Sequence, residues 1–346
     1  MRFSEYTKVY VKIKDALNEG IDDDKKTIIE LLKQTDDKEL VDRVLVFFSK
    51  KFFIDETLKI LEDKNLSKYH DTFMKHFNSA NGSLDDKKEI TELMKSGVFK
   101  SSEILSGKVL TYNDLMPSPF AKNLADNLYN WKPIGGNGGS GKGEALLITY
   151  TGGFVSPKKG DIGSPSGIIE VKGKDGVLSP TYSGGATNGP KHRQKVIDFM
   201  LKISPSSADL VGAKAEFSGV FWLPKLNKAL EKDGCSKKDT TKLLKLMLSS
   251  RPFSGASWVG GIVKSNGSFD TVAFREETWI EGVEEMFASG DFKHIILTTD
   301  TKMISISKNT IRAALKNIKW GIQNSNLSAL ANNSGRAYAP QFSGFK

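Results

Sequence analysis

The stretch GKGEALLITYTGGFVSPKKGDIGSPSGIIEVKGK, residues 141–174, holds the pattern on which the expected fold depends. Its distinctive ionisable side chains are Glu144, Asp161, Glu170 and Lys172. The last two flank Val171 in the segment GIIEVKG, which has the composition of a short strand. Alternate residues of a strand point to the same face. We therefore expect Glu170 and Lys172 to point together, while Ile169 and Val171 point into a core.

Helices and turns are expected on both sides of this strand. A helix should begin near Lys142 with Glu144 in its first turn, where a carboxylate interacts favourably with the helix dipole. The loop TGGFVSPKKGD then delivers Asp161. After the strand, KDG predicts a turn to a returning strand VLSPTY, so that IIEVKGKDGVL forms a central hairpin. The amphipathic helix KHRQKVIDFMLKI follows and opens with cations, an unfavourable position that suggests a phosphate ligand.

The triplet acid-x-Lys is not specific by itself in this chain. It occurs also at residues 36–38, 62–64, 85–87 and 300–302. The first three lie in helical or acidic turn segments, where solvated charge explains them, and the fourth reads as a hairpin turn. Only Glu170 and Lys172 lie on an apolar strand that an Asp and a helical Glu precede. The competing interpretation of that pair is a solvent-facing ion pair on a basic hairpin.

Composition limits the class of protein. The 346 residues are 38% apolar and 10% aromatic, enough for folded cores, and no apolar run approaches the roughly 18 to 20 residues of a membrane span. The first residues do not resemble a signal peptide. The single cysteine, Cys235, excludes an internal disulfide and a cysteine zinc site. These features favour an intracellular, cytoplasmic protein with no membrane partner.

Positive charge is concentrated in one part of the chain. Residues 1–100 carry 19 Lys and Arg against 20 Asp and Glu, a net charge of −1, and the remaining residues carry 31 against 21, a net charge of +10. The excess therefore lies in the part that contains the acidic residues named above. A basic field suits a polyanion such as DNA, although a solvated basic surface explains the charge equally well.

A glycine-rich segment, residues 135–144, partly matches a phosphate-binding loop. Gly136 to Lys142 fit G-x-x-x-x-G-K, but Gly143 stands where Ser or Thr would bind Mg²⁺, and no buried strand precedes the segment. We interpret it as a flexible entry to the helix of Glu144. An ATP-using protein built on Lys142 remains an alternative that nucleotide binding would test.

The rest of the chain reads mostly as helices. Apolar spacings of three and four residues dominate the N-terminal part and residues 205–290, and two apolar strands joined by a turn at 300–302 follow, then a helix over 309–323. The predicted organisation is a helical N-terminal domain (1–130), a first core part (131–204), a helical insertion (205–290), closing strands and helix (291–325) and a loose tail (326–346). No repeat is evident.

The order of Glu144, Gly160-Asp161, Glu170-Val-Lys172 and then a basic helix resembles the PD-(D/E)XK nuclease superfamily over about residues 140–204. The motif is short, and Gly160 stands where the family usually has Pro. The resemblance implies an α+β, or mixed three-layer, restriction-endonuclease-like core made of a helix, three strands, a helix and a further strand, here HIILTT. The lysine-rich composition and the EVKG segment also resemble phage-encoded members.

The resemblance implies Mg²⁺-dependent, or Mn²⁺-dependent, hydrolysis of DNA. Asp161 and Glu170, with the backbone carbonyl of Val171, would hold one or two ions through hard oxygen ligands, and Glu144 would add a further carboxylate. Lys172 would orient or deprotonate the attacking water. The cations expected to contact DNA phosphates are Lys158, Lys159, Lys174, Lys191, Arg193 and Lys195.

A second function from another class fits the same pattern. A nucleic-acid-binding protein, or a virion structural protein of a phage, would keep the fold without cutting DNA, and it would act in the virion or the host cytoplasm. The N-terminal helices are candidates for binding a protein partner or a second copy of the chain. Whether Asp161 and Glu170 converge, and whether Mg²⁺ binds, separates the two readings.

Overall fold

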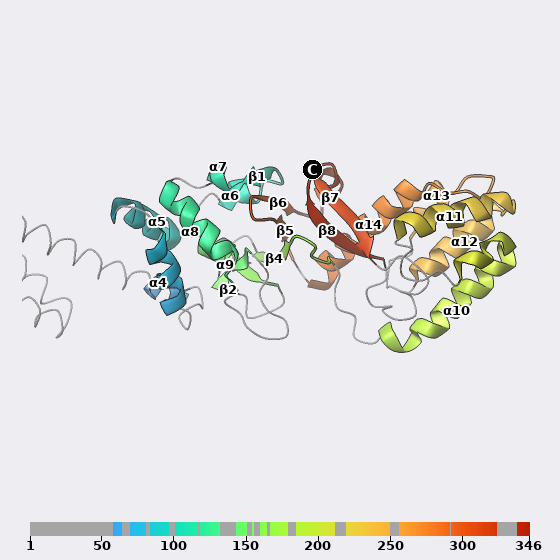
Figure 1. Cartoon of the computed structure of the whole chain (residues 1–346), viewed down its shortest axis with the longest axis horizontal. Coiled ribbons are helices and arrows are strands. Elements are labelled where there is room, and N and C mark those ends of the chain that lie inside the picture. Colours follow the sequence, from blue (N-terminus) through green and yellow to red (C-terminus); the bar gives the residue numbers. More distant parts are fainter. Residues whose placement is uncertain are drawn as a thin grey trace, which may run out of the picture. The chain divides into compact units, whose positions relative to one another are not determined.

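The structure is a computed structural model that describes most of residues 58–346 (Figure 1). The described ranges are 58–63, 70–80, 84–96, 101–115, 118–131, 143–150, 154–155, 160–164, 167–178, 185–211, 219–249, 256–290, 292–323 and 338–346. The chain divides into two compact units, residues 1–59 and 60–346, and the second contains nearly all of the described residues. The helices expected before residue 58 and the glycine-rich segment 135–142 lie outside the described residues.

A mixed six-stranded sheet organises the second unit. Its order is β1-β6-β5-β4-β3-β2. The strands are β1 (Val109–Thr111), β2 (Phe154–Val155), β3 (Ile162–Ser164), β4 (Gly167–Gly173), β5 (His294–Thr298) and β6 (Lys302–Ile306). β4 and β5 are parallel, and the other neighbours are antiparallel. A parallel pair requires a long crossover, and residues 174–293 supply one here.

Helices precede, interrupt and follow the strands. Those before β2 are α4 (His70–Ser79), α5 (Leu84–Ser96), α6 (Ser101–Ile104), α7 (Tyr112–Leu115), α8 (Pro119–Tyr129) and α9 (Glu144–Tyr150). The crossover contains α10 (Gly185–Ile203), the 3-10 helix η2 (Pro205–Leu210), α11 (Gly219–Lys232), α12 (Lys237–Leu248), α13 (Val259–Ile262) and α14 (Thr271–Gly290), and α15 (Ile311–Leu315) follows β6. None of the described helices is both long enough and apolar enough to cross a membrane.

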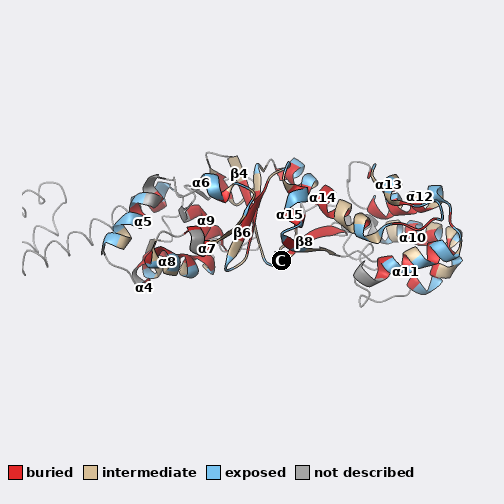
Figure 2. Cartoon of the chain, turned by 90° about the horizontal axis from the view of Figure 1, so that it is seen from above, coloured by how far each residue is buried: buried red, intermediate tan, exposed pale blue. Residues whose placement is uncertain are grey.

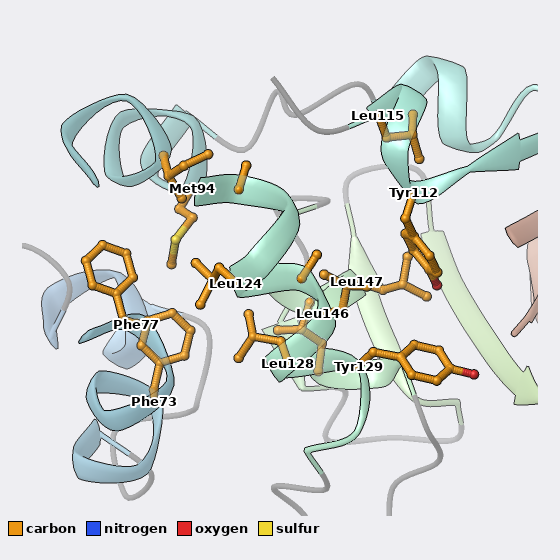
Figure 3. Packing of buried hydrophobic residues seen from close by; sticks show 14 of the residues in the cluster. Phe73, Phe77, Met94, Tyr112, Leu115, Leu124, Leu128, Tyr129, Leu146 and Leu147 are labelled. Carbon is orange, nitrogen blue, oxygen red and sulfur yellow. The ribbon is translucent and has the colours of Figure 1, made fainter. Parts of the chain in front are cut away.

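The two faces of the sheet belong to two different cores because strand residues alternate. Val171 and Ile296 pack with the apolar sides of α4, α5, α8 and α9, which meet around Phe73, Phe77 and Leu124 (Figure 3). Figure 2 shows the buried residues of α8 and α9 in red. On the other face, strand residues such as Ile295 pack with α14 and α15. The fold is therefore mixed α+β with helices on both faces of a mixed sheet.

The predicted central hairpin is wrong. The neighbours of β4 are β3 and β5. In the described part of the expected returning strand, residues 177–178, Val177 forms an isolated bridge with Gln341. Asp175 adopts a left-handed φ of 65° and donates its N–H to the carbonyl of Phe342 at 2.8 Å. The chain therefore leaves the sheet after β4 and joins the C-terminal strand instead.

The C-terminal segment is not a loose tail over residues 338–346. Ala339–Phe345 forms β8, which pairs antiparallel with β7 (Ile318–Gln323), and Tyr338 and Phe342 are fully buried. The helix expected over 309–323 is correspondingly limited to α15. Alternation of apolar and polar residues over IKWGIQ suits a strand once a partner strand is present.

The expected division at residue 130 also differs from the structure. Helices α4, α5 and α8 share one core with the sheet, and β1 pairs with β6, so the described residues between 60 and 130 belong to the same unit as the strands. The helical character of the crossover agrees with the expected insertion. Its long helix α10 begins at Gly185, however, so the cations at 191–195 do not stand at a helix start.

Candidate active site

Asp161 and Glu170 come together through the register of β3 and β4. Ile162 pairs with Ile169 in this antiparallel ladder, and the N–H of Asp161 donates to the carbonyl of Ile169 at 3.1 Å. Asp161 therefore lies opposite Glu170, and directly opposed residues of antiparallel strands point to the same face. The Asp161 carboxylate also accepts the Val171 N–H, with Oδ2 2.7 Å from the nitrogen. This bond holds the carboxylate against the edge of β4.

Lys172 joins the two carboxylates on that face. Its Nζ donates a short hydrogen bond to Oε1 of Glu170. Ile169 and Val171, the intervening residues, are 1% and 2% exposed and pack in the core on the opposite face. The expectation that Glu170 and Lys172 point together while their neighbours point into a core is confirmed.

The acids of this cluster are partly withdrawn from solvent. Glu170 is 9% exposed. Burial raises the pKa of Glu170, Lys172 opposes the rise, and the nearby charge of Asp161 adds to it. Burial likewise raises the pKa of Asp161, while Lys172 and the hydrogen bond from Val171 lower it. Proximity of two carboxylates disfavours ionising both.

The lysine is held in its charged form by these acids. Burial acts to lower the pKa of Lys172, but the charges of Glu170, Asp161 and Glu144 outweigh it, and the net pKa is raised. The side chain of Lys172 retains 24% of its exposure. The ammonium is therefore both charged and reachable from solvent, as a group that stabilises developing negative charge must be.

Glu144 starts helix α9 as expected and is 3% exposed. The turn before it is tightly built. Gly143 has φ +89°, donates its N–H to the carbonyl of Tyr129 at 2.8 Å, and would place a Cβ 3.1 Å from Thr298 Cγ2. A residue with a side chain is strained in that conformation. The glycine that departs from a phosphate-loop motif is therefore required where α9 meets the end of β5.

Gly160, which stands in place of the family's proline, has an equally direct explanation. Its φ is +96°, and a Cβ there would lie 2.3 Å from Ile168 Cγ2. Proline is locked near a φ of about −65° and cannot adopt this conformation. The backbone that delivers Asp161 to β4 accordingly requires glycine.

Tyr129 and Thr298 lie against Gly143, Tyr112 bonds to Thr298, and none of the three was identified from the sequence. The hydroxyl of Tyr112 forms a short hydrogen bond with Oγ1 of Thr298, and the rings of Tyr112 and Tyr129 meet edge to face with centroids 6.1 Å apart. Burial raises the pKa of both phenols, that of Tyr129 to about 12, with a further contribution from Asp300. The bonded pair is 186 residues apart in sequence, so no local signal links them.

Four of the six cations expected to contact DNA lie in the described residues, one after β4 and three on α10. Lys158 and Lys159 lie outside the described residues. Lys174 is exposed one residue beyond β4. On α10, Lys191 and Lys195 are exposed, whereas Arg193 is partly buried and donates to the carbonyl of Val211 at 3.2 Å. The hydrogen bond of Arg193 therefore joins two parts of the helical crossover.

Metal binding is not marked by a large ligand cluster. Within the part of the chain that the structure describes, no group of three or more His, Cys, Asp or Glu side chains is arranged to hold an ion. Two adjacent carboxylates are present, Asp161 and Glu170. Mg²⁺ is commonly bound by one or two carboxylates together with waters and substrate phosphates. The pair therefore fits such an ion by the chemistry of its donors.

Comparison with protein-family models, curated protein sequences and solved structures finds no match to this chain. Inference about function therefore depends on the geometry of Glu144, Asp161, Glu170 and Lys172. These four residues bring three carboxylates and one lysine to the region of β4 and α9, in an environment where burial perturbs the carboxylates that face each other. Perturbed ionisable groups of this kind are typical of functional sites.

Proposed function

We propose that the chain is a Mg²⁺-dependent DNA nuclease of the PD-(D/E)XK type. The observation that carries the proposal is the placement of Asp161 opposite Glu170 across β3 and β4, with Lys172 bonded to Glu170 on the same face. Two neighbouring carboxylates and a lysine are the groups that metal-assisted phosphodiester hydrolysis uses. On the opposite face of β4, Ile169 and Val171 supply apolar contacts to the core.

The order of elements supports the same proposal. Helix α9, strands β2, β3 and β4, helix α10 and strand β5 follow one another in the order that the family resemblance implies, with α11 to α14 inserted before β5. β5 is parallel to β4, as a strand reached through a helical crossover is expected to be. Glu144 begins α9, and Asp161, one residue before β3, lies opposite Glu170 on β4. These are the residues to which the resemblance gives roles in the site.

Each residue has a role that follows from its surroundings. Asp161 and Glu170, with the Val171 carbonyl, would hold Mg²⁺ or Mn²⁺, which when bound polarises the phosphate and favours hydroxide formation from water. Lys172 would orient the attacking water and stabilise charge on the phosphate oxygens. Glu170 and Asp161, with a smaller contribution from Glu144, raise the pKa of Lys172 and keep it charged. The hydrogen bond from the Val171 N–H holds the Asp161 carboxylate in place beside β4.

The test is cleavage of plasmid and linear DNA with Mg²⁺ or Mn²⁺. Wild type is compared with Asp161→Asn and Lys172→Met, which keep side-chain shape, and with the exposed control Asp300→Asn. We expect both site variants to lose cleavage while still binding DNA, and the control to cut at the wild-type rate. Cleavage that survives in both site variants, in the same protein preparation, would refute the assignment.

A second candidate is a DNA-binding or virion structural protein that does not cut. It is favoured by one observation: Lys172 occupies an oxygen of Glu170 that a metal would use. In that case the cluster is a partly buried ion pair. Calorimetric titration with Mg²⁺ or Mn²⁺ separates the candidates, because binding that Asp161→Asn and Glu170→Gln abolish supports the nuclease and an absence of binding supports the non-catalytic protein.

A further inference from the structure

The part of the helical crossover before α14 carries most of the net positive charge of the chain. Residues 185–270 contain 14 Lys and Arg against seven Asp and Glu, a net charge of +7 out of +9 for the whole protein. Helix α14, which follows at once and packs on the sheet, has one Arg and five Glu. The excess charge therefore belongs to residues 185–270, which contain α10 to α13. Figure 1 labels these helices. These helices have their own core, built around residues such as Trp222, Leu230 and Leu243.

Helices α11 and α12 form a helix–turn–helix unit. The turn is residues 233–236, and Gly234 has φ +60°. The N–H of Cys235 bonds to the carbonyl of Leu230 at 3.0 Å and that of Gly234 to Glu231 at 3.1 Å. This is the pattern of a helix that ends in a Schellman motif. Ser236 then caps α12 by accepting the N–H of Asp239 at 3.1 Å.

The two helices diverge after the turn. α11 packs on η2, whereas α12 packs on α10 and α13. Buried Thr240 donates to the carbonyl of Gly267 at 2.9 Å and fixes the first turn of α12 to the loop before α14. A short glycine-containing turn between two divergent helices is the geometry that places a second helix in the major groove of DNA.

The outer side of α12 continues onto α10. Nζ of Lys242 lies 4.7 Å from the centre of the Phe199 ring, a cation–π contact that joins the two helices. Residues three and four positions apart share a helix face. The exposed lysines beside this contact are Lys195 and Lys202 on α10 and Lys238, Lys242 and Lys245 on α12. We call these five residues the lysine face.

We infer that the lysine face is a binding surface for double-stranded DNA, with α12 entering the major groove and α10 contacting the backbone. Lysines on two neighbouring helices match the closely spaced phosphates of a duplex, and the major groove admits one α-helix. Phosphate contacts of this kind give affinity and position without reading sequence. The inference rests on the proposed function in one respect: the duplex held here is the substrate of the Asp161–Glu170–Lys172 site.

A duplex fits this face better than a membrane does. A helix that lies on a lipid surface presents Trp, Phe or Leu on the side opposite its lysines. Besides the lysine face, α12 exposes Lys237 and its C-cap Ser249, while Thr241 and Leu246 are half-buried. Its leucines at 243, 244 and 248 are buried in the core. The surface therefore offers charge and hydrogen bonding but little apolar area.

The experiment measures binding of a fluorescent duplex by anisotropy in EDTA, where no cleavage occurs. The face variant is Lys195→Glu/Lys238→Glu/Lys245→Glu, which leaves the Lys242–Phe199 contact in place. The matched control reverses three exposed lysines outside α10 to α13: Lys308, Lys316 and Lys319. We expect the face variant to bind at least about 30-fold more weakly and to reduce the slope of log affinity against log salt by about 2 to 3, because three phosphate contacts are lost.

The control variant should stay within about threefold of wild type, because its three lysines lie outside the lysine face although its change in net charge is the same. Equal weakening of the two variants, or wild-type binding by the face variant, would overturn the inference. Circular dichroism checks folding, and Lys195→Gln/Lys238→Gln/Lys245→Gln replaces a misfolded face variant. Binding of phosphatidylserine vesicles in preference to duplex would also overturn it.

Failure of the proposed nuclease activity is measured separately. Lys172→Met should weaken duplex binding in EDTA far less than the face variant does, because it removes at most one phosphate contact whereas the face variant removes three. A protein that binds duplex through this face but does not cut would support the inference and refute the nuclease proposal. A protein that cuts DNA, but binds duplex equally well when the lysine face is reversed, would support the nuclease proposal and refute the inference.

Discussion

Two acid-x-Lys triplets in adjacent parts of the sheet show how much their setting matters. Glu170 to Lys172 lies within β4, where Glu170 is 9% exposed and bonds to Lys172. Asp300 to Lys302 lies at the turn from β5 to β6, where Asp300 is exposed and Oγ1 of Thr299 accepts the Lys302 N–H at 3.1 Å. The strand keeps Glu170 and Lys172 on one face, where they form an ion pair, whereas the turn leaves Asp300 exposed. Spacing alone does not produce a reactive cluster.

The largest expected difference between the two triplets is in catalysis. Glu170→Gln should lower the rate of Mg²⁺-dependent DNA cleavage by about 1,000-fold, since both metal binding and charge stabilisation are weakened. Asp300→Asn should change it by less than about threefold, because a solvated turn residue holds nothing in place. Initial rates on plasmid DNA measure both. Similar losses of cleavage rate in the two variants would show that the Glu170 triplet is no more important for catalysis than the Asp300 triplet.

The second largest difference between the two triplets should be in their contribution to stability. Lys172→Met leaves two partly buried carboxylates without their counter-charge and should lower the free energy of unfolding by about 3 kcal/mol at pH 7. Lys302→Met should lower it by less than about 1 kcal/mol. Urea unfolding measures both values. The double variant Glu170→Gln/Lys172→Met should recover part of the loss, and if it is less stable than Lys172→Met alone, the lysine does not act through Glu170.

The backbone that delivers Asp161 should be sensitive to a single methyl group. Gly160→Ala forces a Cβ to within 2.3 Å of Ile168 Cγ2 at a φ of +96° and should cost about 2 kcal/mol or more. Gly234→Ala, also at positive φ but with no atom within 4 Å, should cost only about 1 kcal/mol. Thermal unfolding of both variants tests this order, which equal losses would contradict.

The pH dependence of stability should be the smallest effect. The pKa values of Asp161 and Glu170 are raised on folding, so the folded protein holds their protons more tightly. Their favourable contribution is present below the ordinary carboxyl pKa and is lost as pH rises through the raised values. Asp161→Asn should therefore gain stability relative to wild type between about pH 4 and pH 7. Parallel unfolding curves for the two proteins across this range would contradict the assignment.

Local patterns predicted the elements near the candidate site well. Strand alternation placed Glu170 and Lys172 on one face and Ile169 and Val171 in the core, and the dipole argument placed Glu144 in the first turn of α9. Each of these rests on residues within a few positions of one another. The turn after β5 was also predicted, because Asp300 interrupts two apolar runs.

Long-range pairing was not predictable from such patterns. The expected hairpin after β4 failed because Asp175 turns the chain toward Phe342, and the expected loose tail failed because β7 needed a partner. Tyr112 and Thr298 form a hydrogen bond although they are 186 residues apart, and no local sequence pattern predicts it. The start of α10 was misplaced because Pro190, which reads as a helix boundary, lies inside the helix.

The sequence alone therefore determined the type of side chain at the candidate site and the face on which the strand presents it, because both follow from the two-residue repeat of β4. Only the tertiary structure decided which carboxylate faces which. That choice depends on the register of β3 against β4, on the left-handed turn at Gly160 and on the burial that raises the pKa of both acids. Such features arise from contacts between segments, and they exist only once the sheet and its two layers of helices have assembled.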